Sequence, residues 1–448
     1  MELTLAQALR INSSSCVAFI GAGGKTTAMF QLARQLHSPV IVTATSHLGI
    51  WQIGFADQHI IAETFAAWEE FDHGLKGILL VTGEIEQDRT KPIKKDLLNS
   101  LREFCGYHSI PLLIEADGAR QKPLKAWAAH EPPISSFTDQ VVQVVGLSGV
   151  DRSLSNKYVH RPEIFSELSG LKIGEAVTTA ALVNILTHTK GGLKNIPISA
   201  RRVALLNQAD TAELQAVAHG MVQSLLRAYH SVIISSLEQE KIFAVHEPMA
   251  GIILAAGASM RFGKPKQLLD WKGQPFIRVV AKTALEAGLS PVIVVTGANS
   301  EQIEAAVRDL DAKIVKNAEW KNGQASSIKA GLLTLNPTPL PTRDRIGGAV
   351  FLLIDQPQVT TSILRALIEK HAEGLYPIVA PLVMDQRANP VLFDRTTFSD
   401  LMTLEGDVGG RAIFHKHHVE YLPWHDDRLL LDVDTPEMYQ RLISDETL

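Results

Sequence analysis

At 448 residues, the chain is too long for a single hydrophobic core, so two or three domains are expected. With 46% hydrophobic and 20% charged residues, the composition is that of a globular protein and excludes disorder as the default state. The net charge of −5 argues against a general nucleic-acid binder, because such proteins usually carry a basic surface.

Cysteine usage and the N-terminal segment predict a cytoplasmic protein. The two cysteines, Cys16 and Cys105, fit neither a disulfide framework nor the spacing of a zinc site. The first residues lack the basic segment and apolar core of a signal peptide, and no run of 18 or more apolar residues predicts a membrane helix. We therefore expect a cytoplasmic location, with neither membrane nor nucleic acid as a partner.

Short apolar runs alternate with amphipathic stretches through the first half of the chain. Helical patterns separate several of these runs, for example at residues 173–188 and 211–229. Near-continuous apolar runs separated by helices predict a parallel α/β sheet. The expected strands begin at Cys16, Pro39, Ile78, Pro111, Gln140, Arg202 and Ser231.

The first run feeds a glycine loop, GAGGKTT, which precedes a helical pattern. This order predicts a phosphate-binding loop, in which backbone N–H groups and a helix N-terminus hold phosphates. Lys25 would reach the terminal phosphates of a nucleotide such as ATP or GTP, and Thr26 would ligate Mg²⁺. The loop is shorter than a Walker A loop and resembles the GxxGKT loop of Mur-ligase-like ATPases. The expected nucleotide-binding residues are Gly21, Gly23, Gly24, Lys25, Thr26 and Thr27.

Acidic residues follow a second strand of this half. Glu115 and Asp117 end the run PLLIEAD, at the position where a Walker B site holds Mg²⁺ or its water. Together with Thr26, they are the expected metal ligands of the first half.

Two further polar segments allow more than one interpretation. In LNQAD, Asn207 and Asp210 echo a guanine-reading motif in which Gln208 replaces the lysine, and a plain helix N-cap is the alternative for both. His160 and Arg161 in VHRPE are compatible with either a functional or a structural role.

The first half resembles the YqeC-like accessory proteins linked to selenium-dependent molybdenum hydroxylases. The matching segments, within about residues 13–234, are GAGGKTT, IEADGARQKPLKAWAAHEP, VVGLSGVD, VHRPE and LNQAD. The resemblance implies a nucleotide-binding role in the maturation of that class of enzyme.

The alternation of strands and helices restarts at Met249, after a more polar and irregular segment at 236–248. We therefore expect domains at residues 1–240 and 249–448. The proline-rich segment 336–345 is predicted to be a surface loop. Strands are expected from Gly251, Pro291, Ala312, Ala349 and Pro377, followed by a last extended run from Leu429.

The first strand of the second half ends in a crowded loop, LAAGASMRFGKPKQLL. Small residues from Gly257 onward let backbone N–H groups approach phosphate oxygens, and Arg261, Lys264 and Lys266 can neutralise a polyphosphate. The spacing fits neither a Walker A nor a Rossmann loop, and a surface turn beside solvated lysines is the alternative. The expected nucleotide-binding residues of this loop are Leu254, Ala255, Ala256 and Gly257.

Two aspartates, Asp355 and Asp434, each end an apolar run expected to be a strand. Ligands bind beyond the carboxyl ends of strands in open α/β sheets, so the two carboxylates are expected to converge there as Mg²⁺ ligands. With Arg261 and Lys266 they form the expected catalytic set. Taken singly, such an aspartate is also typical of a turn or a helix cap.

Polar residues on two further segments are candidates for the same site. Gln324, Ser326 and Ser327 follow EWKNG at a predicted helix start, where they either cap the helix or contact the nucleotide. Asp407 and Arg411 lie in the glycine-rich segment EGDVGGR, which is expected to close over a substrate; a helix cap is the alternative for Asp407.

The second half resembles the MobA/MocA-like molybdenum cofactor nucleotidyltransferases, and most of all their cytidylyltransferase branch. The resemblance covers about residues 250–442 and implies a Rossmann-like, mostly parallel sheet with helices on both faces. It implies transfer of CMP from CTP to molybdenum-bearing molybdopterin with release of pyrophosphate, and Ala256 matches the cytidine form of the loop. The matching motifs are LAAGASMRFGKPKQLL, NAEWKNGQASSIKAG, LLIDQPQVT, RANPVLF, LEGDVGGRAIF and LDVDTPEMY.

The same resemblance implies a pterin side of the site and an apo-hydroxylase as a partner. Ala388 departs from the glycine that relatives often carry after the arginine of RANP. A phosphate-monoester nucleophile is already largely dianionic and needs alignment and charge neutralisation instead of a general base. Another phosphorylated acceptor, such as a sugar phosphate, and a nucleotide-gated cofactor chaperone are the alternative functions. The expected pterin-side residues are Arg387, Asn389, Asp407 and Arg411.

Overall fold

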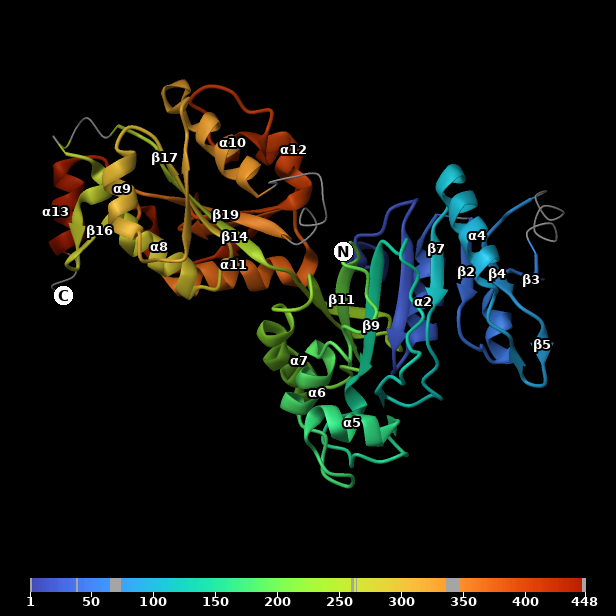
Figure 1. The fold of residues 1–448 in the computed structure, drawn as a ribbon. Helices are drawn as coiled ribbons and strands as arrows, with labels where there is room; N and C mark the ends of the chain where they lie inside the picture. The colour runs from blue at the N-terminus through green and yellow to red at the C-terminus, as the bar shows by residue number, and fades with distance from the viewer. Residues whose placement is uncertain are drawn as a thin grey trace. The chain divides into compact units, whose positions relative to one another are not determined.

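The computed structural model describes residues 2–37, 39–64, 74–258, 262, 264–335 and 346–444. The chain divides into two compact units, Met1–Val245 (unit 1) and His246–Leu448 (unit 2), each with its own large sheet (Figure 1). Within the described part of the chain, no helix combines the length and the hydrophobicity needed to cross a membrane. The predicted surface loop at 336–345 lies outside the described residues.

Unit 1 is built on a nine-stranded sheet with the order β13-β12-β11-β9-β1-β7-β2-β4-β3. Every neighbouring pair from β12 to β3 runs parallel, which confirms the predicted parallel α/β sheet. The strands are β1 (Cys16–Gly21), β2 (Val40–Ala44), β3 (Gln58–Ile61), β4 (Ile78–Thr82), β7 (Leu112–Glu115), β9 (Gln140–Gly146), β11 (Arg201–Asn207), β12 (Ser231–Ser236) and β13 (Lys241–His246).

Helices surround this sheet, and short paired strands lie outside it. β1, β2 and β4 are buried at every position, which explains why their sequences are continuous apolar runs. The short pairs are β5 (Ile85–Glu86) with β6 (Arg89–Thr90), and β8 (Leu124–Lys125) with β10 (Val159–His160). The helices are α1 (Leu5–Leu9), α2 (Lys25–Gln35), α4 (Lys95–His108), α5 (Pro162–Ser169), α6 (Thr179–Thr187) and α7 (Ala212–Leu225), with 3₁₀ turns η1 (Ile50–Phe55) and η2 (Leu147–Gly149).

Two predicted helices of unit 1 are shorter than their sequence patterns. The pattern at 173–188 forms only α6, because Thr178 Oγ1 accepts a hydrogen bond from the Ala181 N–H and begins the helix there. The pattern at 211–229 forms α7, which Thr211 begins in the same way through the Leu214 N–H.

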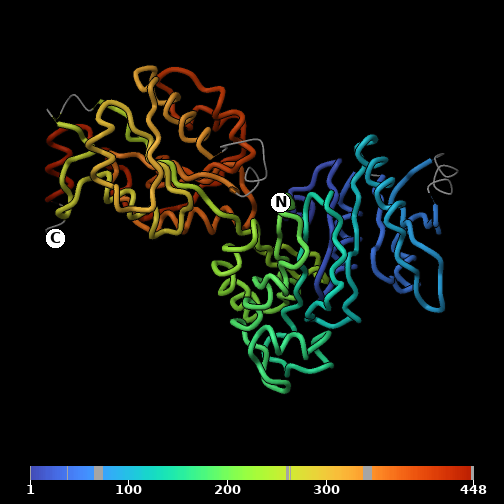
Figure 2. Tube along the Cα trace, in the orientation of Figure 1, coloured from blue at the N-terminus to red at the C-terminus, as the bar shows by residue number. Residues whose placement is uncertain are grey.

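Unit 2 is built on an eight-stranded, mostly parallel sheet with the order β18-β17-β14-β19-β22-β20-β21, and β23 pairs with β20. β22 runs antiparallel to both β19 and β20. The chain runs from β14, in yellow-green, to α13, in dark red (Figures 1 and 2). The strands are β14 (Met249–Ala255), β17 (Val292–Thr296), β18 (Ala312–Lys316), β19 (Gly348–Leu353), β20 (Ile378–Val383), β21 (Gln386–Arg387), β22 (Val391–Asp394) and β23 (Val419–Pro423).

Helices cover both faces of this sheet, as predicted. Alternate residues of β14 enter different cores: Ile253 packs with Phe276 of α8, whereas Ile252 packs with Ile328 of α10. A small hairpin joins β15 (Asp270–Trp271) and β16 (Gln274–Pro275). The helices are α8 (Phe276–Glu286), α9 (Ser300–Val307), α10 (Gln324–Thr334), α11 (Thr361–Gly374), α12 (Phe398–Leu401) and α13 (Pro436–Ser444), with 3₁₀ turns η4 (Lys266–Leu268), η5 (Trp320–Asn322), η6 (Arg395–Thr397), η7 (Gly410–Lys416) and η8 (Asp427–Leu430).

The extended run predicted from Leu429 is wrong, because this segment is not a strand. It begins inside η8 and continues without strand pairing. Its backbone groups bond to the loop after β19 instead: the Val433 N–H donates to the Asp355 carbonyl (3.0 Å), and Gln358 Nε2 donates to the Leu431 carbonyl (2.6 Å). Hydrogen bonds to a backbone carbonyl and to a glutamine side chain therefore take the place of strand pairing in this segment.

A buried pair joins α11 to the end of β22, and we expect it to stabilise unit 2. His371 Nε2 lies 2.8 Å from Asp394 Oδ2, and both side chains are at most 1% exposed. Because His371→Ala removes a partner of a buried carboxylate and leaves a cavity, it should lower the free energy of unfolding by about 3 kcal/mol. Hydrogen-exchange mass spectrometry of the intact chain should show faster exchange in β19 and β22.

His418→Ala is the matched control for this prediction, because it removes an exposed pair with Glu420. Its expected effect is below about 0.5 kcal/mol. Unit 1 peptides serve as an internal reference in both variants. Equal exchange in the two variants would show that the buried pair contributes little.

Candidate functional site

The first candidate site lies in unit 2, where β14 runs into the glycine loop. Gln267 Nε2 donates to the Ala255 carbonyl (2.9 Å) and to the Gly257 carbonyl (2.8 Å), and these two hydrogen bonds fix the start of the loop. Gln267 is 1% exposed and was not among the predicted residues, because nothing in its local sequence marks a buried glutamine. Arg261, a predicted catalytic residue, lies outside the described residues.

The two predicted aspartates meet at one lysine. Lys266 Nζ lies 2.7 Å from Asp434 Oδ1 and 3.3 Å from Asp355 Oδ2, although the three residues come from distant parts of the chain. Asp355 Oδ1 is buried and has no hydrogen-bond partner among the residues that the structure describes. The side chains of Lys266 and Asp355 are 12% and 23% exposed, whereas Asp434 is 47% exposed and open to solvent.

A third carboxylate, Asp432, lies near this pair and was not predicted from the sequence. Asp432 accepts a hydrogen bond from Gln356 Nε2 (2.7 Å). Burial and the negative charge of Asp355 raise the pKa of Asp432 above its usual value. The carboxyl groups of Asp355, Asp432 and Asp434 are therefore close together, and burial and mutual repulsion favour the protonated form of Asp432.

These groups face a cavity of about 750 Å³. Most of the predicted nucleotide-binding residues line it, but Ala255 is buried within β14 and Ser326 bonds to the backbone instead. Its lining residues are Leu254, Ala256, Gly257, Phe262, Lys266, Gln267, Trp320, Gly323, Gln324, Ser327, Leu353, Ile354, Asp355, Asp407 and Asp434.

The start of α10 forms another wall of this cavity. Asp407 Oδ1 accepts a hydrogen bond from the Gln324 N–H (3.1 Å), so Asp407 contacts the start of the distant helix α10 and does not cap the 3₁₀ turn that follows it in its own segment. Ser326 Oγ donates to the Gly323 carbonyl (2.8 Å). Asn317, which was not predicted, donates to Ser326 Oγ (2.8 Å) and to Ser327 Oγ (3.1 Å). The helix start is thus held by side chains from two other segments.

The predicted pterin-side residues lie in three places, and one of them, Asp407, lines the first cavity. Asn389 and Arg411 line a second cavity of about 260 Å³ that shares Leu254, Gln324 and Leu353 with the first. Arg387 instead stacks its guanidinium on Phe414 and Tyr421, at 5.9 and 5.8 Å from their ring centres. Its carbonyl accepts a hydrogen bond from Arg411 Nη2 (3.1 Å), so Arg387 positions Arg411.

The second candidate site lies in unit 1, at the glycine loop between β1 and α2. Gly21, Gly23 and Gly24 have φ values of +96°, +83° and +118°, which favour glycine. A Cβ at Gly23 would lie 2.3 Å from the Gly146 N atom of β9, so the loop packs directly against a neighbouring strand end. The Asn207 Nδ2 group donates to the Gly23 carbonyl (2.8 Å) and fixes the loop from the end of β11.

Lys25, Thr26 and Glu115 lie together at the base of this loop. Lys25 Nζ donates to the Gly21 carbonyl (2.7 Å). Thr26 Oγ1 donates to Glu115 Oε2 (2.9 Å) and accepts from Gln52 Nε2 (2.7 Å). Burial raises the pKa of Glu115, with Lys25 and Thr26 opposing that shift. The predicted hydroxyl and carboxylate are therefore adjacent.

Asp117, the third predicted metal ligand of unit 1, is engaged by protein donors. Its buried carboxylate accepts from the Gly21 N–H (3.1 Å) and from Trp127 Nε1 (2.7 Å), and pairs with Lys25 (3.3 Å) and Lys125 (3.0 Å). Because protein donors saturate it, Asp117 holds the loop and does not line the cavity. Burial outweighs this carboxylate and lowers the pKa of Lys125.

The N-cap alternative for Asn207 and Asp210 is wrong, because Thr211 caps α7. Asn207 instead holds the glycine loop, and Asp210 Oδ1 accepts a hydrogen bond from Ser236 Oγ (2.6 Å). Arg161 pairs with Glu131, with Nη2 2.9 Å from Oε1.

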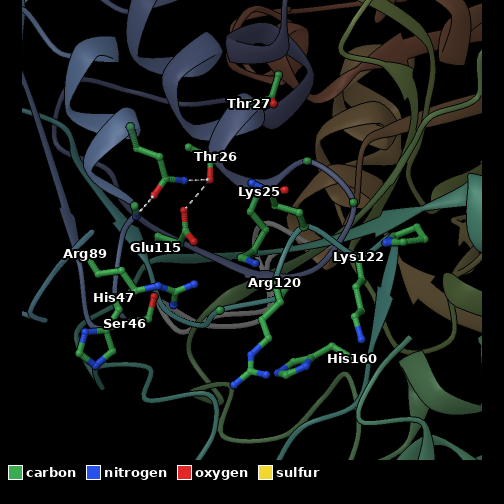
Figure 3. A pocket seen from close by; sticks show the side chains of 18 of the residues that line it. Lys25, Thr26, Thr27, Ser46, His47, Arg89, Glu115, Arg120, Lys122 and His160 are labelled. Atoms are coloured by element: carbon green, nitrogen blue, oxygen red, sulfur yellow. Dashed lines mark hydrogen bonds between the residues drawn. The ribbon is translucent and has the colours of Figure 1, made fainter. Parts of the chain in front are cut away.

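A cavity of about 610 Å³ opens in front of the unit 1 loop (Figure 3). Most of its walls come from the segments after β1, β2, β7, β9 and β11, all at the carboxyl edge of the sheet. Arg89 of β6, Glu131, and His160 and Arg161 at β10 complete the lining. The lining residues are Gly23, Gly24, Lys25, Thr26, Thr27, Ser46, His47, Gly49, Trp51, Gln52, Arg89, Glu115, Gly118, Ala119, Arg120, Gln121, Lys122, Pro123, Glu131, Ser148, His160, Arg161 and Gln208.

Comparison with known proteins identifies a family for each unit. Nicotine blue oxidoreductase from Paenarthrobacter nicotinovorans is 29% identical over 204 residues, which are 44% of this chain and 96% of that protein. YqeC from Escherichia coli (strain K12) is 28% identical over 206 residues, 44% of this chain and 77% of that protein. The crystal structure of Rv0371c from Mycobacterium tuberculosis H37Rv is 31% identical, covers 44% of this chain and 98% of its own, and has a TM-score of 0.39.

Family models locate these similarities along the chain. Residues 17–163 match the model of the YqeC protein, and residues 251–421 match the model of the MobA-like NTP transferase domain. The chain therefore joins a YqeC domain to a MobA-like NTP transferase domain.

Proposed function

We propose that this protein matures the molybdenum cofactor. Unit 2 transfers CMP from CTP to the phosphate of molybdenum-bearing molybdopterin and releases pyrophosphate. The observation that carries this proposal is the meeting of Asp355 and Asp434 at Lys266, beside the glycine loop and inside a cavity large enough for a nucleotide.

The carboxylates are suited to a divalent cation. Asp355 Oδ1 is a buried oxygen without a hydrogen-bond partner among the described residues, and Asp434 is open to the cavity. Carboxylate oxygens in this number and exposure are the ligands that Mg²⁺ takes beside substrate phosphates. Bound there, the ion would neutralise the phosphate that is attacked and help to align it.

The reaction needs positioning and charge neutralisation from the chain itself. The acceptor phosphate oxygen attacks the α-phosphorus of CTP, a new P–O bond forms, and the bond to the departing pyrophosphate breaks. Lys266 and Arg261 offset the negative charge of the pyrophosphate, while Gln267 holds the loop whose N–H groups face the phosphates. Asn389 and Arg411 line the adjoining cavity, which suits the acceptor.

The name of one relative indicates a second candidate function. Nicotine blue oxidoreductase matches along nearly its whole length, and its name denotes redox chemistry on another substrate. An oxidoreductase of that kind would change the oxidation state of its substrate and release no pyrophosphate. A transferase for another phosphorylated acceptor, by contrast, would still release pyrophosphate from CTP.

Unit 1 is proposed to bind ATP or GTP and to serve the same cofactor. Thr26 and Glu115 are adjacent at the loop and suit Mg²⁺, while Lys25 is placed for the phosphates. Such a module would act in sulfur or selenium insertion, or in delivery of the cofactor to an apo-hydroxylase in the cytoplasm.

Removing one cation ligand should abolish transfer in unit 2. Asp355→Asn keeps the shape of the side chain but removes its charge, and we expect release of pyrophosphate from CTP and molybdopterin to fall at least about 100-fold. Asp309→Asn is the matched control, because that exposed aspartate pairs with Arg278 away from the cavity. A cofactor chaperone would keep delivering cofactor to the hydroxylase with the Asp355 variant.

Ala256 is expected to select the pyrimidine. It is 6% exposed and lines the cavity beside Gly257, so its methyl group narrows the space for the base. Ala256→Gly should therefore lower the ratio of kcat/KM for CTP to that for GTP by about tenfold or more. Ala258→Gly tests whether loosening the loop alone changes the preference, and an equal shift in both variants would contradict our interpretation.

Lys25 is expected to govern nucleotide binding in unit 1. Calorimetric titration of the intact chain with ATP and with GTP, in saturating CTP to fill unit 2, should give a Kd at least about tenfold weaker for Lys25→Ala. Lys95→Ala, an exposed change on α4, should bind as the wild type does. Unchanged affinity in Lys25→Ala would remove the assignment of a phosphate-binding loop.

A further inference from the structure

The cavity of unit 1 carries cations that neither the glycine loop nor an acidic partner accounts for. Arg89, Arg120 and Lys122 all line it, and among the described residues none of the three has an ion pair. The cavity's other cations are compensated, because Lys25 pairs with Asp117 and Arg161 pairs with Glu131. Three positive charges without an acidic partner therefore face a ligand, and of these only the Lys122 side chain donates a hydrogen bond within the described part of the chain, from Nζ to the Val159 carbonyl (3.4 Å).

Two of these cations, Arg120 and Lys122, lie on one side of the cavity, whereas Arg89 lies beside Ser46 and His47 in the view of Figure 3. Arg89 belongs to β6, and Arg120 and Lys122 belong to the segment after β7. In the view of Figure 3, Arg120, Lys122 and His160 lie below Lys25 and Thr26, on the side away from Thr27. A ligand held by Arg120 and Lys122 would adjoin the terminal phosphate bound at Lys25.

The backbone holds the segment of Arg120 and Lys122 firmly against the glycine loop. The Gly23 N–H donates to the Lys122 carbonyl (3.1 Å), and the Gly146 N–H donates to the Pro123 carbonyl (3.0 Å). Arg120 and Gln121 have φ values of +49° and +58°, a conformation that non-glycine residues adopt only where the surroundings impose it. The spacing between the two anion-binding elements is thus built into the fold.

His160 also lines this cavity, and mainly its burial keeps the imidazole neutral. Its pKa is lowered to about 4, first by burial and then by the charges of Arg161 and Lys125, with Arg120 adding to the effect. The imidazole is therefore neutral near pH 7 and offers a hydrogen bond to a ligand without adding charge.

A separate hollow on the other side of Thr26 and Thr27 offers space for the nucleoside. This cavity of about 340 Å³ has an aromatic side formed by Phe30 and Phe55, whose rings lie 5.3 Å apart. Gln31 Oε1 is buried there without a hydrogen-bond partner among the described residues. A nucleotide with its base in this hollow and its phosphates at the glycine loop would not reach Arg120 and Lys122. These two cations would then lie beyond its terminal phosphate.

We propose that unit 1 binds a second substrate, a small molecule with a phosphate monoester group, at Arg89, Arg120 and Lys122. Guanidinium groups match the oxygens of a dianionic phosphate, and the three unpaired charges suit a dianion better than a neutral ligand. This inference rests on the proposed nucleotide binding of unit 1, and it identifies the class of molecule that faces the nucleotide there.

The test uses the intact chain saturated with Mg²⁺, CTP and the non-hydrolysable ATP analogue AMP-PNP. Calorimetric titration with glycerol 2-phosphate should show binding that the double variant Arg120→Ala/Lys122→Ala weakens at least tenfold. The same variant should bind AMP-PNP within threefold of the wild type, which also shows that it is folded. Glycerol, the neutral counterpart, should not bind, and the control variant Lys76→Ala/Lys95→Ala, which changes two exposed lysines outside the cavity lining, should match the wild type.

Three results would overturn the proposal, each in a different way. If the double variant loses AMP-PNP affinity as far as Lys25→Ala does, the cations belong to the nucleotide's own phosphates. If the wild type binds AMP-PNP but its glycerol 2-phosphate binding is absent or unaffected by the double variant, unit 1 has no second anion site and its proposed nucleotide binding still stands. If the wild type fails to bind ATP, GTP or AMP-PNP in unit 1, the proposed function falls together with this inference.

Discussion

In a parallel sheet, all the loops that follow the strands lie at the same edge of the sheet. Both candidate sites depend on this constraint. In unit 1, five segments that follow strands line one cavity. In unit 2, the loops after β14 and β19 meet the start of α10. Residues separated by a hundred positions or more can meet there without any long-range signal in the sequence.

Similar acidic residues acquire different roles at these two edges, because their surroundings differ. Asp117 follows β7 by two residues and is buried under two lysines, a tryptophan N–H and a backbone N–H. Asp355 follows β19 by two residues and keeps one oxygen without a hydrogen-bond partner among the described residues. A carboxylate surrounded by protein donors stabilises a loop, whereas one with an unused oxygen is suited to a cation.

In both units a glycine loop faces a cavity, and cationic side chains lie farther along that cavity or in an adjoining one. In unit 2 the adjoining cavity contains Arg411, and the cavity of unit 1 contains Arg89, Arg120 and Lys122. This common plan makes the joining of the two domains in one chain chemically coherent, because both would act on phosphorylated molecules.

Much of the fold could be predicted from local sequence. Continuous apolar runs predicted the buried strands of both sheets, because parallel strands are covered on both faces. Glycine loops at Gly21–Gly24 and Gly257 predicted where phosphates would bind, since a backbone that approaches a ligand or adopts positive φ needs glycine. Thr178 and Thr211, which begin α6 and α7, could also have been identified as N-caps from the sequence. The apolar patterns around these two helices extend beyond the helix ends, so the predicted helices were too long.

The sequence by itself determined the number of domains, the parallel sheets and the two loop positions, because these follow from composition and spacing within short segments. Only the tertiary structure decided which polar groups meet. It placed Asp434 beside Asp355 through a segment that is not a strand, turned Asn207 toward the glycine loop, and buried Asp117. Such contacts depend on the order of strands in the sheet and on the donors packed around each carboxylate, which no short segment of sequence encodes.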